Sequence, residues 1–487
     1  MVKPFVPPTR ILIDGKWRES SSGETFEVVA PARGELLCEV AAATAQDVDD
    51  AVRSAHHAFV SGVWSRRAGA ERGRVLWCFA DLIEQHLPEL AALESIDVGR
   101  PVSESLHAEL PMVVDTLRHF AGWADKVTGT TFDLPPFGGA ERFSYTRHEP
   151  LGVVGAITPW NAPTMIAMWK IAPALAAGNS VVLKPAAEAP LTALALGQLA
   201  LEAGVPAGVL NVIPGRGAVA GAALAAHPLV DKISFTGSTT IGRKIAVTAG
   251  ENLTKLTLEL GGKNPQIIWP DADLEAVIPI AALSAFANQG QTCASGSRIY
   301  VHRTVLDDFS QRLATHAQSL RVGDPADPET EVGSLINERQ MRRVLHYIQT
   351  AKDEGATIVT GGSRVGTVGY FIEPTVFVAS NSLTIAREEI FGPVSTIIPF
   401  DDDDEVLNMA NSSEYGLTAV LWTDSASRIQ RFVRELEVGV VWVNAWGPPH
   451  PALPWLGTKS SGIGEELGRA GLEAVTKIKT VNQLSTQ

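Results

Sequence analysis

The sequence predicts an α/β protein with two parallel sheets, and three observations support this expectation. Short apolar runs alternate with Ala-rich helical stretches between residues 150 and 260. The same alternation, with longer elements, returns over residues 262–460. The chain has 487 residues, which is too long for one hydrophobic core. Strands that are joined by helices form parallel sheets with right-handed crossovers and both faces covered.

The first alternating stretch contains strand-like runs that are separated by helical ones. The strands are expected at residues 153–157, 180–184, 209–213, 232–236 and 255–260. The helices are expected near residues 163–177, 190–203, 217–226 and 239–249. Ligands of such sheets bind outside the carboxyl ends of the strands, so we expect a ligand site at that edge.

The second stretch predicts another α/β domain, which contains Cys293. Its helices are expected near residues 273–287, 304–319, 338–354, 402–412 and 425–436. Its strands are expected near residues 298–302, 371–377, 395–400, 418–422 and 440–443.

Residues 129–150 interrupt the alternation with a segment rich in Gly, Pro and Thr. The segment ends in the strand-like run Phe143–Arg147, which predicts a hairpin that projects from the body. Unpaired strand edges usually find a partner strand, so we expect an oligomer contact here. The tail over residues 476–487 suggests strand exchange between subunits of a dimer or tetramer.

Composition argues against several classes of partner. The formal net charge of −14 disfavours nucleic acid and anionic membranes, because phosphate binding needs clustered Lys and Arg. No apolar run reaches the roughly 18 residues that span a bilayer. Histidine-containing stretches such as His56–His57 lack the spacing of a metal site. The cysteines Cys38, Cys78 and Cys293 are odd in number and widely spaced, which fits a reducing cytoplasm. We expect a cytoplasmic enzyme without a metal.

A thiol and a carboxylate stand at the ends of two predicted elements. Cys293 lies on a polar, Gly-containing loop between a helix and the strand 298–302, and Glu259 ends an apolar strand before two glycines. A single cysteine is more often a small buried residue than a nucleophile. The loop favours chemistry, and the pair suggests covalent catalysis with its own general base.

Other polar groups follow the predicted strands, and each has a purely structural alternative. Asn161 follows the first strand and suits an oxyanion donor, although a turn residue fits equally well. Lys184 ends the second strand within reach of a ribose or phosphate, although a surface lysine is the commoner reading. The segment Phe235–Gly242 turns from a strand into a helix, and the N-terminus of that helix could bind a pyrophosphate. A plain strand–turn–helix without a ligand fits this segment equally well.

Two further glycine segments are less specific. Gly215–Ala220 matches the Gly-x-Gly-x-x-Gly/Ala dinucleotide pattern after the third strand. No acidic residue stands about 20 positions further on, which favours a turn whose Gly217 lies near a cofactor. Glu389–Pro393 is a tight segment that alone fits a turn at a strand edge.

Together these segments resemble the NAD(P)-dependent aldehyde dehydrogenase superfamily along nearly the whole chain. The ordered matches are Ile13–Trp17, Thr158–Asn161, Lys184–Pro185, Phe235–Ser238, Glu259–Gly262, Gly290–Cys293, Glu389–Pro393 and Ser461–Gly464. The resemblance implies an aldehyde dehydrogenase-like fold with a Rossmann-type cofactor-binding domain, a second α/β catalytic domain and a small β oligomerisation hairpin. The cofactor-binding domain would comprise residues 1–128 and 151–261, the catalytic domain residues 262–460, and the oligomerisation segment residues 129–150 and 461–487.

The resemblance also implies a covalent cycle that oxidises an aldehyde to the carboxylic acid. The thiolate of Cys293 would form a thiohemiacetal, whose oxyanion is held by the Asn161 amide and a backbone N–H at Cys293. Hydride would pass to the nicotinamide, and Glu259 would activate the water that hydrolyses the thioester. Lys170 matches a family lysine that supports proton movement near the glutamate.

The cofactor implied is NAD, with NADP use left open. The residues implied to bind it are Ile157, Trp160, Lys184, Gly217, Gly237, Ser238, Gly242, Leu260, Glu389 and Phe391. Lys184 and Glu389 would bind ribose hydroxyls, and Trp160 and Phe391 would flank the nicotinamide ring. NAD-selective members often have Glu three residues after the lysine, where this chain has Ala187, followed by Glu188.

The implied substrate pocket is wide and apolar. Its residues would be Ala162, Met165, Trp169, Ala287, Thr292, Trp446 and Trp455. Ala162 and Ala287 stand where the family commonly has aromatic walls, which disfavours an aromatic cage for betaine aldehyde. Residues 444–457 contain no Arg for a succinate semialdehyde carboxylate. We therefore expect a bulky apolar or aromatic aldehyde as the small-molecule substrate.

Two other functions are compatible with the same scaffold. An acylating dehydrogenase would pass the acyl group to coenzyme A, although a water-activating Glu259 would waste its thioester. A non-catalytic structural protein, as some lens crystallins are, would not need Asn161, Glu259 and Cys293 together.

Overall fold

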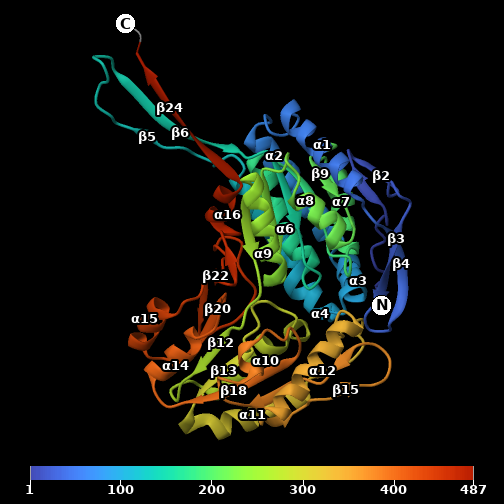
Figure 1. The fold of residues 1–487 in the computed structure, drawn as a ribbon, viewed down its shortest axis with the longest axis vertical. Helices are drawn as coiled ribbons and strands as arrows, with labels where there is room; N and C mark the ends of the chain where they lie inside the picture. Colours follow the sequence, from blue (N-terminus) through green and yellow to red (C-terminus); the bar gives the residue numbers. More distant parts are fainter. Residues whose placement is uncertain (1, 486–487) are drawn as a thin grey trace.

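The computed structural model describes residues 2–485, and its largest sheet has eight strands in the order β2-β1-β9-β8-β7-β10-β11-β23 (Figure 1). These strands are β1 (Ile11–Ile13), β2 (Lys16–Arg18), β7 (Val153–Ile157), β8 (Ser180–Lys184), β9 (Leu210–Val212), β10 (Lys232–Thr236), β11 (Lys255–Glu259) and β23 (Gly462–Ile463). The strands from β9 through β11 run parallel. All the strands predicted between residues 150 and 260 are present, with ends that agree within one residue.

Helices cover both faces of this sheet, which explains why its central strands β7, β8, β9 and β10 are buried along their whole length. Val154 and Ala156 of β7 point into one apolar cluster, whereas Val153 and Ile157 point into another. The helices over the first cluster are α2 (Gly69–Gln85), α3 (Leu87–Val98), α5 (Leu110–Trp123), α6 (Pro163–Ala177) and α7 (Leu191–Glu202). The helices over the second are α1 (Ala45–Ser61), α8 (Ala222–Ala225) and α9 (Thr239–Asn252).

The second sheet has seven strands in the order β14-β17-β18-β13-β12-β20-β21. They are β12 (Pro265–Ile268), β13 (Arg298–His302), β14 (Thr357–Thr360), β17 (Thr375–Val378), β18 (Val394–Phe400), β20 (Thr418–Trp422) and β21 (Val440–Val443). The predicted helices are present as α10 (Leu274–Phe286), α11 (Leu306–Ser319), α12 (Glu338–Asp353), α14 (Asp403–Asn411) and α15 (Ala426–Glu435).

The strand expected at residues 371–377 is wrong as a single element. It is divided into β16 (Phe371–Ile372) and β17, with Pro374 in the gap. Proline has no N–H for a strand ladder, so β16 pairs instead with the short β15 (Arg364–Val365). The strands β12 and β14, each four residues long, were not predicted.

A three-stranded arm projects from the body, as predicted for residues 129–150 (Figure 1). It consists of β5 (Thr131–Phe132), β6 (Arg142–Pro150) and β24 (Thr476–Leu484), with β6 in the middle. β24 pairs antiparallel with β6 along its whole length. The part of residues 461–487 that precedes β24 lies elsewhere, because β23 joins the eight-stranded sheet and α16 (Gly468–Ala474) contacts α6.

Short elements complete the chain. They are β3 (Thr25–Ala30), β4 (Glu35–Ala41), α4 (Val102–Glu104), η1 (Ser105–Glu109), η2 (Gly217–Gly221), η3 (Ala287–Gly290), η4 (Arg303–Val305), α13 (Thr384–Arg387), β19 (Tyr415–Gly416) and β22 (Thr458–Lys459). Within residues 2–485, no helix combines the length and apolarity that a membrane crossing requires.

Candidate active site

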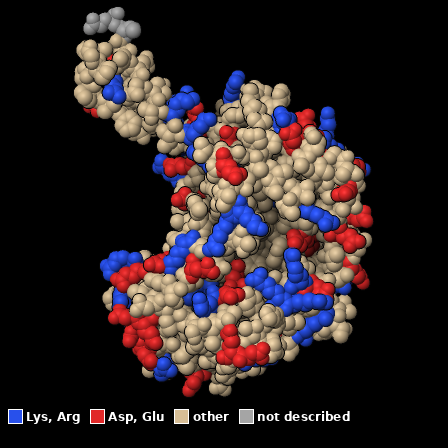
Figure 2. Space-filling model, in the orientation of Figure 1, with Lys and Arg blue, Asp and Glu red and all other residues tan. Residues whose placement is uncertain are grey.

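A cleft of about 1920 Å³ opens at the carboxyl ends of the parallel strands of the eight-stranded sheet. Ile157, Lys184 and Thr236, the last residues of β7, β8 and β10, all line it. Asn337 and Phe391 line it from the side of the seven-stranded sheet. Figure 2 shows this hollow with Lys and Arg side chains around its mouth. The position is where parallel sheets bind ligands, as the sequence predicts.

Cys293 lines this cleft and is half-buried. The turn η3 leads into its loop with Asn288 at φ 48° and Gln289 at φ 56°, both in the left-handed region. Such conformations cost of order 1–3 kcal/mol each for residues other than glycine and persist only where the surroundings fix them. The cysteine loop is therefore held by its neighbours.

The surroundings of Cys293 favour the protonated thiol over the thiolate. Burial raises its pKa to about 12, and the negative charges of Glu259 and Glu389 add to the effect. Backbone N–H groups at Cys293 and Ala294 only partly oppose it. Because the thiolate is the nucleophile, the thiol needs a proton acceptor or a nearby cation before it can react.

Glu259 ends β11 and is almost fully buried, with 3% of its surface exposed. Neither of its carboxylate oxygens has a hydrogen-bond partner among the described residues. Burial, followed by repulsion from Glu466, raises its pKa well above the usual range, and Lys170 opposes the shift. A carboxyl group with a raised pKa suits general acid–base chemistry near neutral pH.

Lys170 forms a buried ion pair with Glu466, a residue that sequence reasoning missed. The Lys170 Nζ donates to Glu466 Oε1 at 2.5 Å and to Thr236 Oγ1 at 2.8 Å. Ser234 Oγ also donates to Glu466 Oε1, at 2.6 Å. The acidic pair Glu465–Glu466 follows closely after the Ser461–Gly464 match, and this was the available signal.

Asn161 lines the same cleft and is held against the cysteine loop. Its Nδ2 donates to the carbonyl oxygen of Gln291 at 2.8 Å. Gln291 precedes Cys293 by two residues, so the amide group lies beside the loop that bears the thiol. The structure thus brings the predicted Asn161 and Cys293 together.

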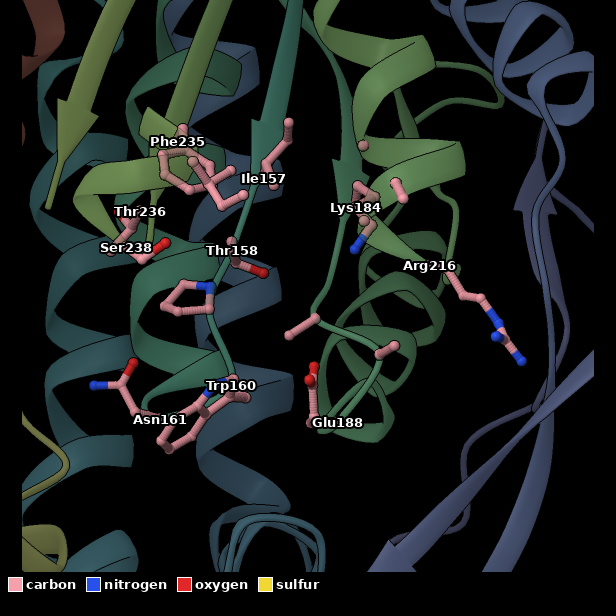
Figure 3. Close-up of a pocket in the computed structure, with 18 of the residues that line it drawn as sticks. Ile157, Thr158, Trp160, Asn161, Lys184, Glu188, Arg216, Phe235, Thr236 and Ser238 are labelled. Atoms are coloured by element: carbon pink, nitrogen blue, oxygen red, sulfur yellow. The ribbon is translucent and has the colours of Figure 1, made fainter. Parts of the chain in front are cut away.

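Most of the predicted cofactor-binding residues surround the cleft (Figure 3). The cleft-lining ones are Ile157, Trp160, Lys184, Gly217, Gly237, Ser238, Leu260, Glu389 and Phe391. Gly242 does not line it. A Cβ on Gly242 would lie 2.5 Å from Leu260 Cδ2, so this glycine lets α9 pack closely against Leu260.

Two buried polar ends fit the hydroxyl groups of a nucleotide sugar. Lys184 Nζ donates to the Pro185 carbonyl at 2.8 Å, and burial lowers its pKa to about 8 while Glu188 opposes the shift. Glu389 accepts from the Gly262 N–H at 3.0 Å, and burial raises its pKa. Each keeps hydrogen-bonding capacity at the wall of a long cleft, as a dinucleotide requires.

Ala187 and Glu188 both line the cleft near Lys184. Glu188 forms an ion pair with Arg339 at the start of α12, at 3.4 Å. The carboxylate of Glu188, the residue next to Ala187, is thus paired with the guanidinium group of Arg339.

Four tryptophan rings form a row that reaches the cysteine loop. The ring centroids of Trp169 and Trp455 lie 5.5 Å apart, and Trp442 lies 6.1 Å from Trp455 and 6.2 Å from Trp446. Trp442, on β21, was not predicted. The predicted pocket residues Ala162, Met165, Trp169 and Trp455 pack in one apolar cluster that Cys293 also touches. Ala287 and Thr292 are half-buried on the cysteine loop, and the Trp446 indole N–H donates to Ala294 O at 3.4 Å.

A sequence model of the aldehyde dehydrogenase family matches residues 17–481. The putative aldehyde dehydrogenase DhaS of Bacillus subtilis is 48% identical over 473 residues, which cover 97% of this chain and 95% of that protein. The chain belongs to the aldehyde dehydrogenase family. The predicted fold class and the predicted enzyme class, an NAD(P)-dependent aldehyde dehydrogenase, are confirmed.

Solved structures of other aldehyde dehydrogenases share the fold. The NAD+ complex of the enzyme from Bacillus cereus is 42% identical with a TM-score of 0.96, covering 98% of this chain and 96% of that one. The P. syringae indole-3-acetaldehyde dehydrogenase AldA, solved as a mutant with NAD+ and IAA, is 41% identical with a TM-score of 0.96. The latter match covers 99% of this chain and 97% of that one.

The raised pKa of Cys293 predicts its alkylation behaviour in the cofactor-free enzyme. We expect labelling by iodoacetamide to accelerate about tenfold per pH unit from roughly pH 7 to 9, because the thiolate fraction rises tenfold per unit below the pKa. Mass spectrometry of the Cys293 peptide gives the rate, and Cys293→Ser identifies the signal. A rate that levels off near neutral pH would contradict the prediction.

Proposed function

We propose that this enzyme oxidises an aldehyde to the carboxylic acid through a covalent intermediate on Cys293. The observation that supports it most is that a thiol and an amide donor line one cleft, while the buried carboxyl group of Glu259 lies near enough for its charge to act on the thiol. Cys293 would react as the thiolate, after its thiol proton has passed to water in the cleft, and its sulfur would bond to the aldehyde carbon. The oxygen that becomes negative would accept from Asn161 Nδ2 and a backbone N–H, a stabilisation worth about 10²–10³ in rate per donor.

NAD(P), when bound, would accept the hydride from the thiohemiacetal carbon. Lys184 and Glu389 would hold ribose hydroxyls, and the N-terminus of α9 at Ser238 would face the pyrophosphate. Trp160 and Phe391, whose rings meet edge to face at 5.3 Å, would limit the space beside the nicotinamide.

Glu259 would complete the cycle by taking a proton from the water that attacks the thioester. The acid would then leave and the Cys293 sulfur would be freed. Glu259 would then pass this proton towards the hydrogen-bonded ion pair of Lys170 and Glu466. The charges of both residues act on Glu259. The high pKa of Glu259 makes it a strong base once it is ionised.

Substitutions at Glu259 and Cys293 should separate the two halves of the cycle. In Glu259→Gln we expect the first turnover of NADH to persist while steady-state turnover falls by roughly 10²–10⁴, because only the hydrolysis needs the base. Cys293→Ala should abolish both phases. Stopped-flow absorbance of NADH measures both. Undiminished turnover in Glu259→Gln, or turnover that depends on coenzyme A, would refute the hydrolytic role.

We infer that the substrate is a bulky apolar or aromatic aldehyde. The tryptophan cluster reaches the cysteine loop, where the Trp446 indole N–H donates to Ala294 O, and small side chains at Ala162 and Ala287 would leave room for a large substrate group. The similar P. syringae protein is an indole-3-acetaldehyde dehydrogenase, which is consistent with a ring-sized aldehyde.

Narrowing the pocket should affect large aldehydes selectively. In Ala287→Phe we expect kcat/KM for phenylacetaldehyde to fall roughly tenfold or more while acetaldehyde is unaffected, because an added ring excludes only the larger group. Leu283→Phe, at a position of α10 that is 52% exposed, is the matched control. Wild-type preference for acetaldehyde over phenylacetaldehyde would contradict the proposed substrate class.

We also propose that the three structural units have separate tasks. Residues 1–128 and 151–261 would bind the cofactor, residues 262–460 would supply the thiol, and the arm would bind a second copy of the chain. The arm exposes Phe132, Phe137, Phe143 and Ile478, each by 45% or more, and the outer edge of β24 has no strand partner within residues 2–485. Apolar side chains beside an open strand edge favour pairing with another strand.

Polar substitutions on the arm should reduce the assembly. We expect the double variant Phe143→Ser, Ile478→Ser to shift the enzyme from an oligomer towards a monomer. Analytical ultracentrifugation would show this as a fall in molecular mass from a multiple of the chain mass towards the mass of one chain. Both residues present apolar surface that burial against a partner would stabilise. Lys477→Ser, on the neighbouring exposed position of β24, should leave the mass unchanged. A monomeric wild-type enzyme would rule out this role of the arm.

A further inference from the structure

Arg100 lies in a buried cluster of acidic groups outside the catalytic residues. It follows α3 and is 5% exposed. Its Nη1 lies 3.1 Å from Glu94 Oε1 and also contacts Glu109, and its Nε lies 3.5 Å from Glu104 Oε1. One cation therefore faces three carboxyl groups, and two of them, Glu94 and Glu109, are buried.

A π-helical turn brings two of these acidic residues together. In η1 the N–H of Leu110 bonds to the carbonyl of Ser105, five residues earlier. Glu104 directly precedes this turn and Glu109 ends it, and both side chains contact Arg100. Single π-turns occur frequently at functional sites, and the cluster beside this one contacts Asn161 through Arg100.

The guanidinium group reaches the backbone of Asn161. Arg100 Nη2 donates to the Asn161 carbonyl oxygen at 2.9 Å, and Asn288 Nδ2 donates to the same oxygen at 2.8 Å. The side-chain amide of Asn161 donates in turn to Gln291 O. Asn161 is thus fixed at both its backbone and its side chain.

The same cluster also fixes the cysteine loop. Glu104 Oε2 accepts from the backbone N–H of Asn288 at 3.0 Å. Asn288 is the first of the two left-handed residues of η3, which precede Cys293 by only a few positions. The carboxylate that faces Arg100 therefore holds the strained turn, while Arg100 itself holds Asn161.

We propose that Arg100 is a positioning residue that sets the separation between the Asn161 amide and the Cys293 sulfur. This inference rests on the proposed role of Asn161 as the oxyanion donor. The planar guanidinium offers several donors in fixed directions, so it serves the Asn161 carbonyl and the carboxylates at once. A lysine keeps the charge but offers one compact ammonium group, which leaves some of these partners without a donor.

Stability alone is a weak reason for this arrangement. Buried ion pairs contribute little net stability, because desolvation of the charges offsets their attraction. A cluster with more acids than bases contributes still less. The geometry that the cluster imposes on Asn161 and Asn288 is what an apolar replacement could not supply.

A double-mutant cycle in the full-length enzyme tests the inference. We expect Arg100→Lys to slow single-turnover NADH formation roughly tenfold to a hundredfold, with a larger isotope effect from C1-deuterated aldehyde. The KM for NAD should be unchanged, because Arg100 does not line the cofactor cleft. In an Asn161→Ala background, Arg100→Lys should slow single-turnover NADH formation by less than about twofold, because the donor that Arg100 positions is gone.

Two further variants complete the test. Asn288→Gly tolerates the left-handed turn but removes the amide that holds the Asn161 carbonyl, so it should show the same loss and the same non-additivity. Arg118→Lys, in the surface ion pairs with Asp81 and Glu84, should leave the rate unchanged. An Arg100→Lys enzyme as fast as the wild type, or losses that multiply with Asn161→Ala, overturns this inference alone. An Asn161→Ala enzyme of undiminished rate overturns the proposed oxyanion role as well.

Discussion

Burial of a few ionisable groups is the constraint on which this active site depends. Burial is the main reason why the pKa values of Cys293 and Glu259 are raised and that of Lys184 is lowered. In water these groups would be a neutral thiol, a weak carboxylate base and a charged amine. In the proposed mechanism, burial would make the carboxyl group of Glu259 a competent base, and the charges of the buried Lys170 and Glu466 act on it.

The two sheets must meet closely for this chemistry, and the chain between them is built for close approach. β11 ends at Glu259 and β12 begins at Pro265, so one short connection links the carboxylate to the sheet whose loop bears the thiol. A Cβ on Gly262 would lie 2.5 Å from the carbonyl oxygen of Cys293, which only glycine avoids. The Gly262 N–H also bonds to Glu389, so the same connection contacts both the thiol loop and the cofactor wall.

Sequence alone could predict the features that depend on local pattern. The strands of the large sheet are short apolar runs because helices bury both faces, and Glu259 and Lys184 were found because each ends such a run. Glu466 could not be found this way, since it meets Lys170 across 296 positions of the chain. Arg100 was missed for the same reason: its contacts with Asn161 arise from tertiary packing, and charged side chains usually mark a solvated surface.

The wall proposed to face the aldehyde differs in kind from the wall proposed to face the cofactor. The cofactor wall is formed largely by strand ends and helix starts, whereas the other is formed by side chains from α6, the cysteine loop and the segment after β21. Under this proposal, gene duplication followed by single substitutions at positions such as Ala162 or Ala287 would produce new aldehyde preferences without disturbing nucleotide recognition. A lineage with this architecture can diversify its metabolism at little structural cost.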